Sequence, residues 1–227
     1  METIALYTYC KSSAAYRIRI ALHYKEIPYH AHYVSLINNG GENYSPEYTS
    51  MNPQAMVPTL KVAEETLTQS MAILEYLEET FSDPPLLPQS PIARATARSY
   101  AQMVACDIHP LNNLRVLQYL EDPLQQSQDN RTTWYQHWIY EGFDAMERRL
   151  TTNALTGDYC IGNHPSVADV CLIPQVYNAL RYHCEMTRFP TIKRIYDHCL
   201  TLDAFKSAAP ENQDDYTQSV LNLGLSY

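Results

Sequence analysis

The apolar and polar positions of this chain follow short, strand-like spacings at first and long helical spacings later. Residues 3–8 have the composition of a β-strand, and the apolar positions of residues 13–25 recur with helical spacing. Alternating positions over residues 28–36 predict a half-buried strand. These three segments form a β-α-β unit, which implies a parallel strand pair with a right-handed crossover.

A further strand and helix follow in the same half of the chain. Residues 57–62 predict a strand whose second residue is proline, and the Val57-Pro58 step suits a cis peptide bond. Residues 70–80 carry an apolar stripe with helical spacing. The order of these elements predicts an α/β N-terminal domain.

A proline-rich stretch over residues 81–91 separates this half from one that reads as helix throughout. Prolines at four positions stiffen the stretch, so we expect a domain over 1–82, a linker over 83–90 and an all-helical domain over 91–227. Helices are predicted over 92–120, 131–152, 166–183 and 191–200, with a short one from 203. Ser166 and Asp169 have capping-box spacing. The polar tail over 210–227 is expected to pack loosely.

The charge balance narrows the possible partners. With 16 basic and 25 acidic residues the net charge is −9, which argues against a nucleic-acid or anionic-membrane partner. Residues 11–25 differ from the rest, because they contain four basic residues and no acid. The chain is therefore basic locally, as a small anionic ligand requires.

The six cysteines and the first residues indicate the compartment. The cysteines are scattered without a CxxC pair, so we expect reduced thiols. The opening residues lack the features of a signal peptide, and no apolar run approaches the length of a membrane span. We therefore expect a cytoplasmic protein.

Two predicted helix starts have the chemistry of anion sites. A helix start exposes unpaired backbone N–H groups and the positive end of the helix dipole. Ser12 and Ser13 stand at the first start, with no acid in the first turn. Ser70 is expected as the N-cap of the second, which also lacks an early acid. We expect the first to hold a thiolate and the second a carboxylate.

Several motifs together resemble the zeta class of glutathione transferases. The class signature, usually written SSCxxRVRIAL, is similar to residues 12–22, which read SSAAYRIRIAL. The resemblance continues through 52–60 (NPQAMVPTL), 109–114 (HPLNNL), 168–176 (ADVCLIPQV) and 189–192 (FPTI). It extends to about residue 209. It implies a thioredoxin-like N-terminal domain followed by an all-α C-terminal domain, the glutathione transferase fold, and a homodimer.

The resemblance also implies glutathione as the cofactor and assigns residues to it. The turn at the start of the first helix would hold the sulfur end, the Val57 backbone would pair with the cysteinyl part, and Gln69 and Ser70 would take the γ-glutamyl carboxylate. Asn43 matches a loop position that contacts the peptide. The other implied contacts are Ser12, Ser13, Ala14, Ala15, Tyr16 and Arg17 in the turn, and His109, Asn113, Leu114 and Arg115 in the second domain. Some of these contacts would come from a dimer partner.

Ser12 is the expected catalytic donor to the sulfur, assisted by the backbone N–H groups near Ala14 and Ala15. Ser13 is the alternative donor and the expected N-cap. Ala14 stands where many members of the class have cysteine, which excludes a protein thiol at that point. Cys10 superficially resembles the reactive thiol of a glutaredoxin, although the resemblance to the zeta class places Ser12 at the reactive position.

The resemblance implies a reaction and leaves alternatives open. The expected reaction is the glutathione-dependent cis–trans isomerisation of maleylacetoacetate to fumarylacetoacetate, with Arg181 binding the anionic substrate. Maleylpyruvate is an alternative substrate. A transferase that conjugates small electrophiles such as α-halo acids, and a non-catalytic module for protein association, are the competing functions.

Overall fold

The computed structural model describes residues 3–217 of the 227-residue chain. The chain forms two compact units. Unit 1 comprises Met1–Pro85 and Leu202–Tyr227, and unit 2 comprises Leu86–Thr201. The domain boundaries predicted from the sequence placed all residues after 90 in one helical domain. In the structure, the segment from Leu202 belongs to unit 1 instead.

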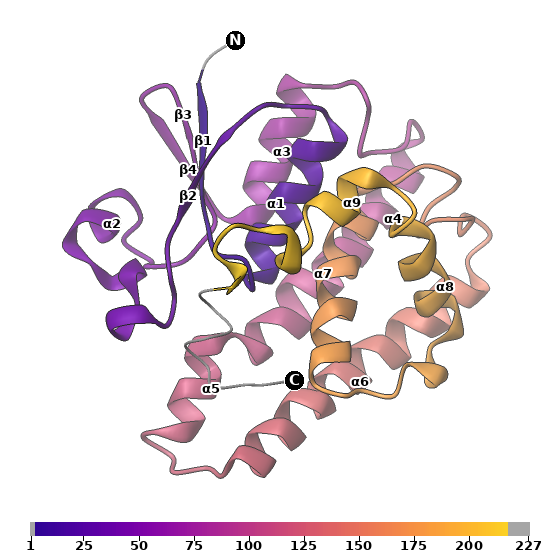
Figure 1. Ribbon diagram of the computed structural model, residues 1–227. Helices are drawn as coiled ribbons and strands as arrows, with labels where there is room; N and C mark the ends of the chain where they lie inside the picture. The colour runs from indigo at the N-terminus through magenta and orange to yellow at the C-terminus, as the bar shows by residue number, and fades with distance from the viewer. Residues whose placement is uncertain (1–2, 218–227) are drawn as a thin grey trace. The chain divides into compact units, whose positions relative to one another are not determined.

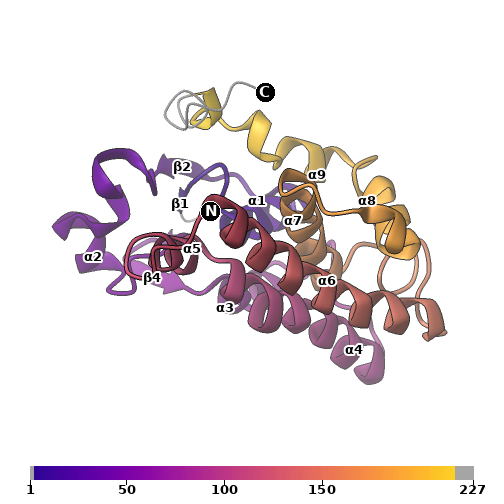
Figure 2. The same ribbon diagram turned by 90° about the horizontal axis from the view of Figure 1, so that it is seen from below.

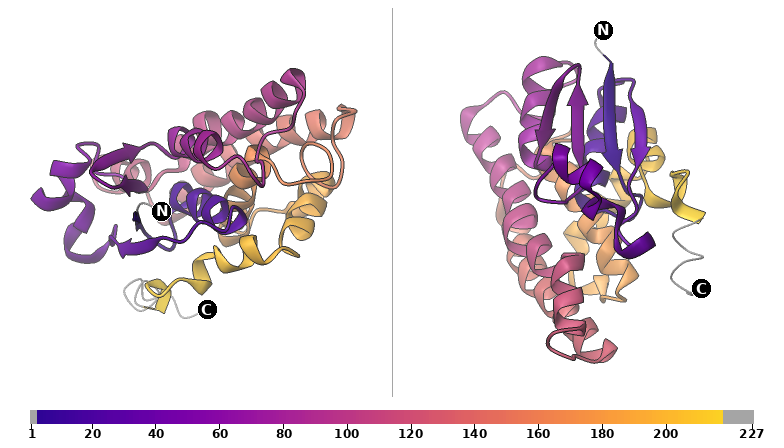
Figure 3. Two further views of the ribbon diagram at one scale, coloured as in Figure 1. Left: turned by 90° about the horizontal axis from the view of Figure 1, so that it is seen from above. Right: turned by 90° about the vertical axis from the view of Figure 1, so that its left-hand side faces the viewer.

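Unit 1 contains a four-stranded sheet in the order β2-β1-β3-β4. Strand β1 pairs in parallel with β2 and antiparallel with β3, which pairs antiparallel with β4 (Figures 1 and 3). The central strands carry the buried positions, such as Leu6 and Leu60 at 0% exposure. The strands are β1 (Ile4–Thr8), β2 (His30–Tyr33), β3 (Thr59–Val62) and β4 (Glu65–Thr68).

Helices cover both sides of this sheet. Helix α1 (Ser13–Tyr24) packs against α3 (Ser70–Thr80) on one side, and α2 (Pro46–Met51) lies on the other (Figure 1). The apolar stripes predicted from the sequence are the buried faces of α1 and α3. Two short 3₁₀ turns, η1 (Asn38–Gly40) and η2 (Glu42–Tyr44), precede α2. The predicted α/β thioredoxin-like domain is confirmed.

Strand β2 departs from its prediction. Only His30–Tyr33 of the expected strand over 28–36 forms, and all four residues are exposed. The prediction of a half-buried strand was wrong because β2 is an edge strand, paired on one side only.

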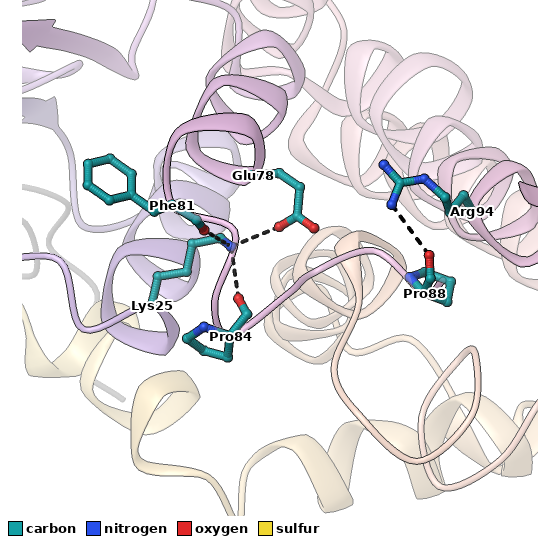
Figure 4. Close-up of polar contacts among 6 residues, drawn as sticks. All are labelled: Lys25, Glu78, Phe81, Pro84, Pro88 and Arg94. Carbon is teal, nitrogen blue, oxygen red and sulfur yellow. Dashed lines mark hydrogen bonds and ion pairs between the residues drawn. The ribbon is translucent and has the colours of Figure 1, made fainter. Parts of the chain in front are cut away.

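A buried lysine ties α1 to the beginning of the linker (Figure 4). The Lys25 side chain is 0% exposed, and its Nζ lies 2.8 Å from Oε2 of Glu78, whose side chain is 9% exposed. The same ammonium donates to the carbonyl oxygens of Phe81 and Pro84, at 2.6 and 2.8 Å. In unit 2, Arg94 Nη1 donates to the Pro88 carbonyl at 3.4 Å. Each unit therefore holds its own part of the linker.

Unit 2 is helical throughout its described elements. The predicted capping box at the start of α7 is present, because the Ser166 hydroxyl and the Asp169 carboxylate each accept the other's backbone N–H groups. Burial raises the pKa of the Asp169 carboxyl. The helices are α4 (Pro91–Gln102), α5 (Leu114–Glu121), α6 (Gln128–Thr152), α7 (Val167–Arg181) and α8 (Pro190–Cys199), with the short turn η5 (Met186–Arg188).

The single helix predicted over residues 92–120 is interrupted. After α4 the chain widens into a π-helical segment, η3 (Met103–Ile108), and then tightens into a 3₁₀ turn, η4 (His109–Asn112). Pro110 lies inside η4 and lacks the N–H that an α-helix would use there. Asn113 then takes extended dihedrals and caps α5, so the prediction of a single helix over 92–120 was wrong.

The end of the described chain packs on helix α1. This segment contains α9 (Asp203–Ser207) and the 3₁₀ turn η6 (Pro210–Asn212), and α9 contacts α1 (Figure 2). Tyr16 donates its hydroxyl to the Phe205 carbonyl at 3.2 Å. Within the loose tail predicted over 210–227, Pro210 is buried and residues 211–217 are exposed or half-buried. Asp215 and Tyr216 nevertheless contact the residues around Cys10, and residues 218–227 lie outside the described residues.

Candidate active site

The turn between β1 and α1 ends in Ser12, which caps the helix. Ser12 has extended dihedrals, and its Oγ accepts the N–H of Ala15 at 3.2 Å. Ser13 is the first helical residue and is 5% exposed. The prediction of Ser13 as the N-cap was therefore wrong. Because Ser12 uses a lone pair for the cap, its hydroxyl proton remains for donation to a ligand.

The first turn of α1 lacks acidic residues, as predicted for an anion site. The helix dipole is therefore not offset there by a nearby carboxylate. Cys10 lies just before the turn and is 0% exposed, within a cluster that also contains Tyr9, Val34, Tyr48 and Val57. Because its thiol is fully buried, Cys10 lacks the accessibility of a glutaredoxin thiol.

The start of helix α3 lies close to the first turns of α1. Arg17 of α1 is 2% exposed and donates through Nη1 to Ser70 Oγ at 3.1 Å. This hydrogen bond brings the two predicted helix starts together. The Arg17 guanidinium thus contacts a hydroxyl that the resemblance assigns to the ligand.

Gln69, rather than Ser70, occupies the N-cap position of α3. Gln69 has a positive φ of 69°, which is uncommon for a residue with a side chain, and makes no side-chain cap. Helical dihedrals therefore begin at Ser70, and the prediction of Ser70 as the N-cap was wrong. The Gln69 amide donates to Gln54 Oε1 at 2.6 Å. The N–H groups of this helix start are consequently not capped by a side chain.

The Val57-Pro58 peptide bond is cis, as predicted. Within residues 3–217, the backbone N–H and C=O of Val57 make no hydrogen bond. The flanking backbone is fixed by side chains that the sequence did not single out, since Tyr48 and Asn52 donate to the Met56 carbonyl at 2.7 and 2.8 Å. Val57 is thus held firmly while both of its backbone groups stay available to a ligand.

Asn43 is buried in the loop before α2. Its Nδ2 donates to the Ala55 carbonyl at 2.7 Å, and its Oδ1 has no partner among the described residues. Gly41 has a φ of +105°, and a Cβ at this position would lie 2.7 Å from Asn43 Oδ1. Glycine at position 41 therefore permits the placement of an unpartnered acceptor.

The residues of unit 2 that were predicted to contact glutathione lie in one continuous stretch, 109–115. His109 begins η4, and Asn113 caps α5 by accepting the Arg115 N–H at 3.1 Å. Arg115 itself is exposed. Helix α6 holds this stretch, because the Trp134 indole donates to the Leu111 carbonyl at 2.9 Å and Asn112 donates to the Tyr135 carbonyl at 3.1 Å.

Arg181 is the last residue of α7. Its Nη1 donates to Asn178 Oδ1 at 3.3 Å, and its guanidinium carbon lies 6.0 Å from the centre of the Tyr182 ring. The Tyr182 ring stacks on Tyr135 of α6 at 3.5 Å, and burial raises the pKa of its phenol. Arg181 is half-buried, and its guanidinium contacts the neutral side chains of Asn178 and Tyr182, an arrangement that suits an anion.

Comparisons with known proteins show the family to which the chain belongs. A profile of the family described as glutathione S-transferase, N-terminal domain, matches residues 11–80. A probable maleylacetoacetate isomerase of Vibrio cholerae is 46% identical over 215 residues, which cover 95% of this chain and 99% of that protein.

Two solved structures extend the comparison. The holo structure of a maleylpyruvate isomerase, a bacterial zeta-class glutathione transferase, has a TM-score of 0.90 and 39% identity, covering 93% of this chain and 99% of that one. A maleylacetoacetate isomerase of Methylobacterium extorquens AM1, with malonate and glutathione bound, has a TM-score of 0.89 and 40% identity, covering 92% of this chain and 97% of that one.

A thioredoxin-like unit with a serine-capped helix start, followed by a helical unit, defines the class of glutathione transferases. The predicted fold and the resemblance are both confirmed. Within this class, the chain belongs to the zeta family that contains the maleylacetoacetate isomerases. The prediction of glutathione as cofactor agrees with the bound glutathione of its relatives. The individual site residues stay predictions.

Proposed function

We propose that the protein is a glutathione-dependent isomerase that converts maleylacetoacetate to fumarylacetoacetate. The observation that carries the proposal is the hydrogen bond from Arg17 to Ser70, which joins two acid-free helix starts into one anion-binding region. The kinship with isomerases described above supports the reaction. A dicarboxylic keto-acid substrate, a homodimer and a cytoplasmic location belong to the same proposal. Within residues 3–217, no helix is both long and apolar enough to cross a membrane.

The residues of unit 1 fit the functional groups of glutathione. The free N–H and C=O of Val57 match a peptide backbone, which both donates and accepts. The unpartnered Oδ1 of Asn43 is a buried acceptor for an N–H group. The uncapped start of α3, with Ser70 beside the Arg17 guanidinium, matches a carboxylate.

Glutathione supplies a thiol whose thiolate adds reversibly to a conjugated double bond and so allows rotation about it. In the proposed mechanism the Ser12 hydroxyl donates to the sulfur, while the start of helix α1 supplies positive potential. Both interactions favour the thiolate over the thiol and lower the thiol pKa. Ala14 contributes its backbone N–H, since its methyl group has no chemistry of its own. Arg181 binds a carboxylate of the substrate.

Replacing Ser12 tests the assignment directly. We expect Ser12→Ala to lower kcat about 10²-fold, the scale for losing one preorganised donor. The thiol pKa of bound glutathione, followed through the ultraviolet absorbance of the thiolate, should rise in the same variant. A kcat within about twofold of wild type would contradict the role of Ser12 as donor, because losing a preorganised donor lowers kcat far more than that.

Ser127 offers a matched control, because it caps α6 with the same geometry. Its Oγ accepts the Asn130 N–H at 3.2 Å, the distance found at Ser12. Ser127→Ala should therefore cost about 1 kcal/mol of stability, as Ser12→Ala does through its cap. Only Ser12→Ala should lower kcat and raise the thiol pKa.

Maleylpyruvate is the second candidate substrate, because the holo maleylpyruvate isomerase structure has a TM-score of 0.90 with this chain. An isomerisation assay with each substrate, with and without glutathione, decides between them. Turnover of maleylacetoacetate without added glutathione would contradict the proposed mechanism.

A further inference from the structure

The strand end and turn that precede Ser12 are held by residues distant in sequence. Arg19 is 0% exposed and donates to four acceptors. Its Nη1 donates to Thr8 Oγ1 and the Tyr9 carbonyl at 3.0 and 3.2 Å, and its Nη2 donates to the Cys10 carbonyl at 2.9 Å. Its Nε donates to the Ala208 carbonyl at 2.9 Å. One buried guanidinium thus connects the turn to the returning end of the chain.

The returning segment also contacts the turn directly. The Cys10 N–H donates to Asp215 Oδ2 at 2.9 Å, across 205 positions of sequence. Tyr216 packs against the buried cluster that contains Cys10 and Val57, and Lys11 Nζ lies 5.7 Å from the centre of its ring. Cys10 is therefore bound at both backbone groups by charged side chains, its N–H by a carboxylate and its C=O by a guanidinium. Charge-assisted hydrogen bonds of this kind are the stronger class.

We propose that the contacts of Phe205, Ala208 and Asp215 form a C-terminal clasp that positions Ser12 for the reaction, with Asp215 as its positioning residue. The inference rests on the proposed function of Ser12 as donor to the sulfur. Cys10 and Ser12 are two residues apart in one turn, and the Ser12 N–H donates to the Tyr9 carbonyl at 3.0 Å. Any shift of Tyr9 and Cys10 therefore moves the Ser12 hydroxyl.

A positioning role and a charge effect of Asp215 predict opposite changes in the thiol pKa of bound glutathione. The carboxylate is an anion near a site for an anion, so removing its charge should by itself favour a thiolate. Loss of the acceptor for the Cys10 N–H should instead displace the donor and disfavour the thiolate. The two effects move the thiol pKa of bound glutathione in opposite directions, which makes the proposal testable with substitutions at one position.

Asp214 provides a matched control beside Asp215. It carries the same charge, but its Oδ2 accepts the Tyr33 hydroxyl of the edge strand at 3.1 Å rather than a group of the turn. We expect Asp215→Ala to lower kcat/KM about tenfold or more, since misplacing a reacting group by an ångström has effects of this order. Asp215→Asn keeps an oxygen acceptor and should stay within about twofold of wild type, as should Asp214→Ala.

Two readouts separate this inference from the proposed function. Amide hydrogen exchange of the glutathione-free protein should be faster at Cys10 in Asp215→Ala, and unchanged in Asp214→Ala. The thiol pKa of bound glutathione should rise in Asp215→Ala alone. Unchanged exchange at Cys10, or equal losses of kcat/KM in Asp215→Ala and Asp215→Asn, would overturn the clasp. If the wild-type protein binds glutathione but does not isomerise maleylacetoacetate, the proposed reaction is overturned. Hydrogen exchange at Cys10 and the thiol pKa of bound glutathione would still test the clasp in that case.

Discussion

The buried ion pair between Lys25 and Glu78 should be among the costliest polar contacts of unit 1 to break. The Lys25 side chain is fully buried, and its three N–H donors have three acceptors, the Glu78 carboxylate and the carbonyl oxygens of Phe81 and Pro84 (Figure 4). Lys25→Met keeps most of the apolar volume and removes the charge. The Glu78 carboxylate then stays buried without the Lys25 ammonium beside it.

The burial of both partners sets the expected magnitude. Removing one partner of a buried pair costs about 3–5 kcal/mol, because the remaining charge loses its compensation. For a chain of this length that corresponds to a fall in Tm of about 6–20 °C. Lys25→Met/Glu78→Leu should recover most of the loss, since replacing both charges with apolar groups is often neutral or stabilising.

Urea and thermal unfolding of the single and double variants measure these values. Lys206 serves as the control, because its Nζ lies 3.6 Å from Asp203 with both side chains largely exposed. Lys206→Met should change the free energy of unfolding too little to measure. A loss below about 1 kcal/mol for Lys25→Met, the scale of an exposed pair, would refute the reasoning. A double variant no more stable than Lys25→Met would refute the role assigned to the Glu78 charge.

Three further perturbations test other parts of the structure. Arg181→Ala should lower the isomerisation rate about tenfold or more, the scale of one charged hydrogen bond. The rate of glutathione conjugation with a neutral electrophile should fall less, and equal losses in the two assays would argue against Arg181 as the group that binds the substrate carboxylate. Burial and the Arg19 charge hold the pKa of His23 below its usual 6.5. The stability this contributes is fully present above the unfolded pKa and falls as the pH drops through the lower folded pKa. The urea midpoint of the wild type should therefore fall as the pH drops below about 6.5, and His23→Gln should make that fall smaller; the same pH profile in both proteins would contradict this. Gly142→Ala places a methyl group against the Ile108 side chain and should cost about 1–3 kcal/mol in urea unfolding; wild-type stability would show that Ile108 moves aside without cost.

The sequence carried strong local signals for the two helix starts and for the cis bond of the site. Serines before acid-free helical segments, and a Val-Pro step at a strand start, are features of neighbouring residues, so they predicted Ser12, Ser70 and the cis bond at Val57. The N-cap residues were misassigned by one position at both helices. A cap is decided by the dihedrals of a single residue, and adjacent residues such as Ser12 and Ser13 have the same preference.

Contacts between distant segments lacked such signals. The Arg19 guanidinium binds mostly backbone carbonyls, which every residue carries, so no side chain marks Ala208 or Cys10 as its partner. Asp215 is one of three acids in a polar tail, and no local pattern sets it apart from the other two. The π-helical segment before His109 was missed for a similar reason, since it differs from an α-helix only in its hydrogen-bond step.

The structure changes the interpretation of the basic residues near the first helix. Their excess of positive charge predicted attraction of an anionic ligand, yet two of them are engaged within the fold. Arg19 donates to the turn and Lys25 to the linker, and Arg17 lies beside Ser70 at the other helix start. Around Cys10, the Arg19 cation lies at the carbonyl and the Asp215 anion at the N–H, so their fields largely offset each other. The thiolate must then be stabilised mainly by neutral groups, the Ser12 hydroxyl and the first-turn N–H groups. Such groups act over hydrogen-bond distance only, which is why the position of the turn should matter more than its charge.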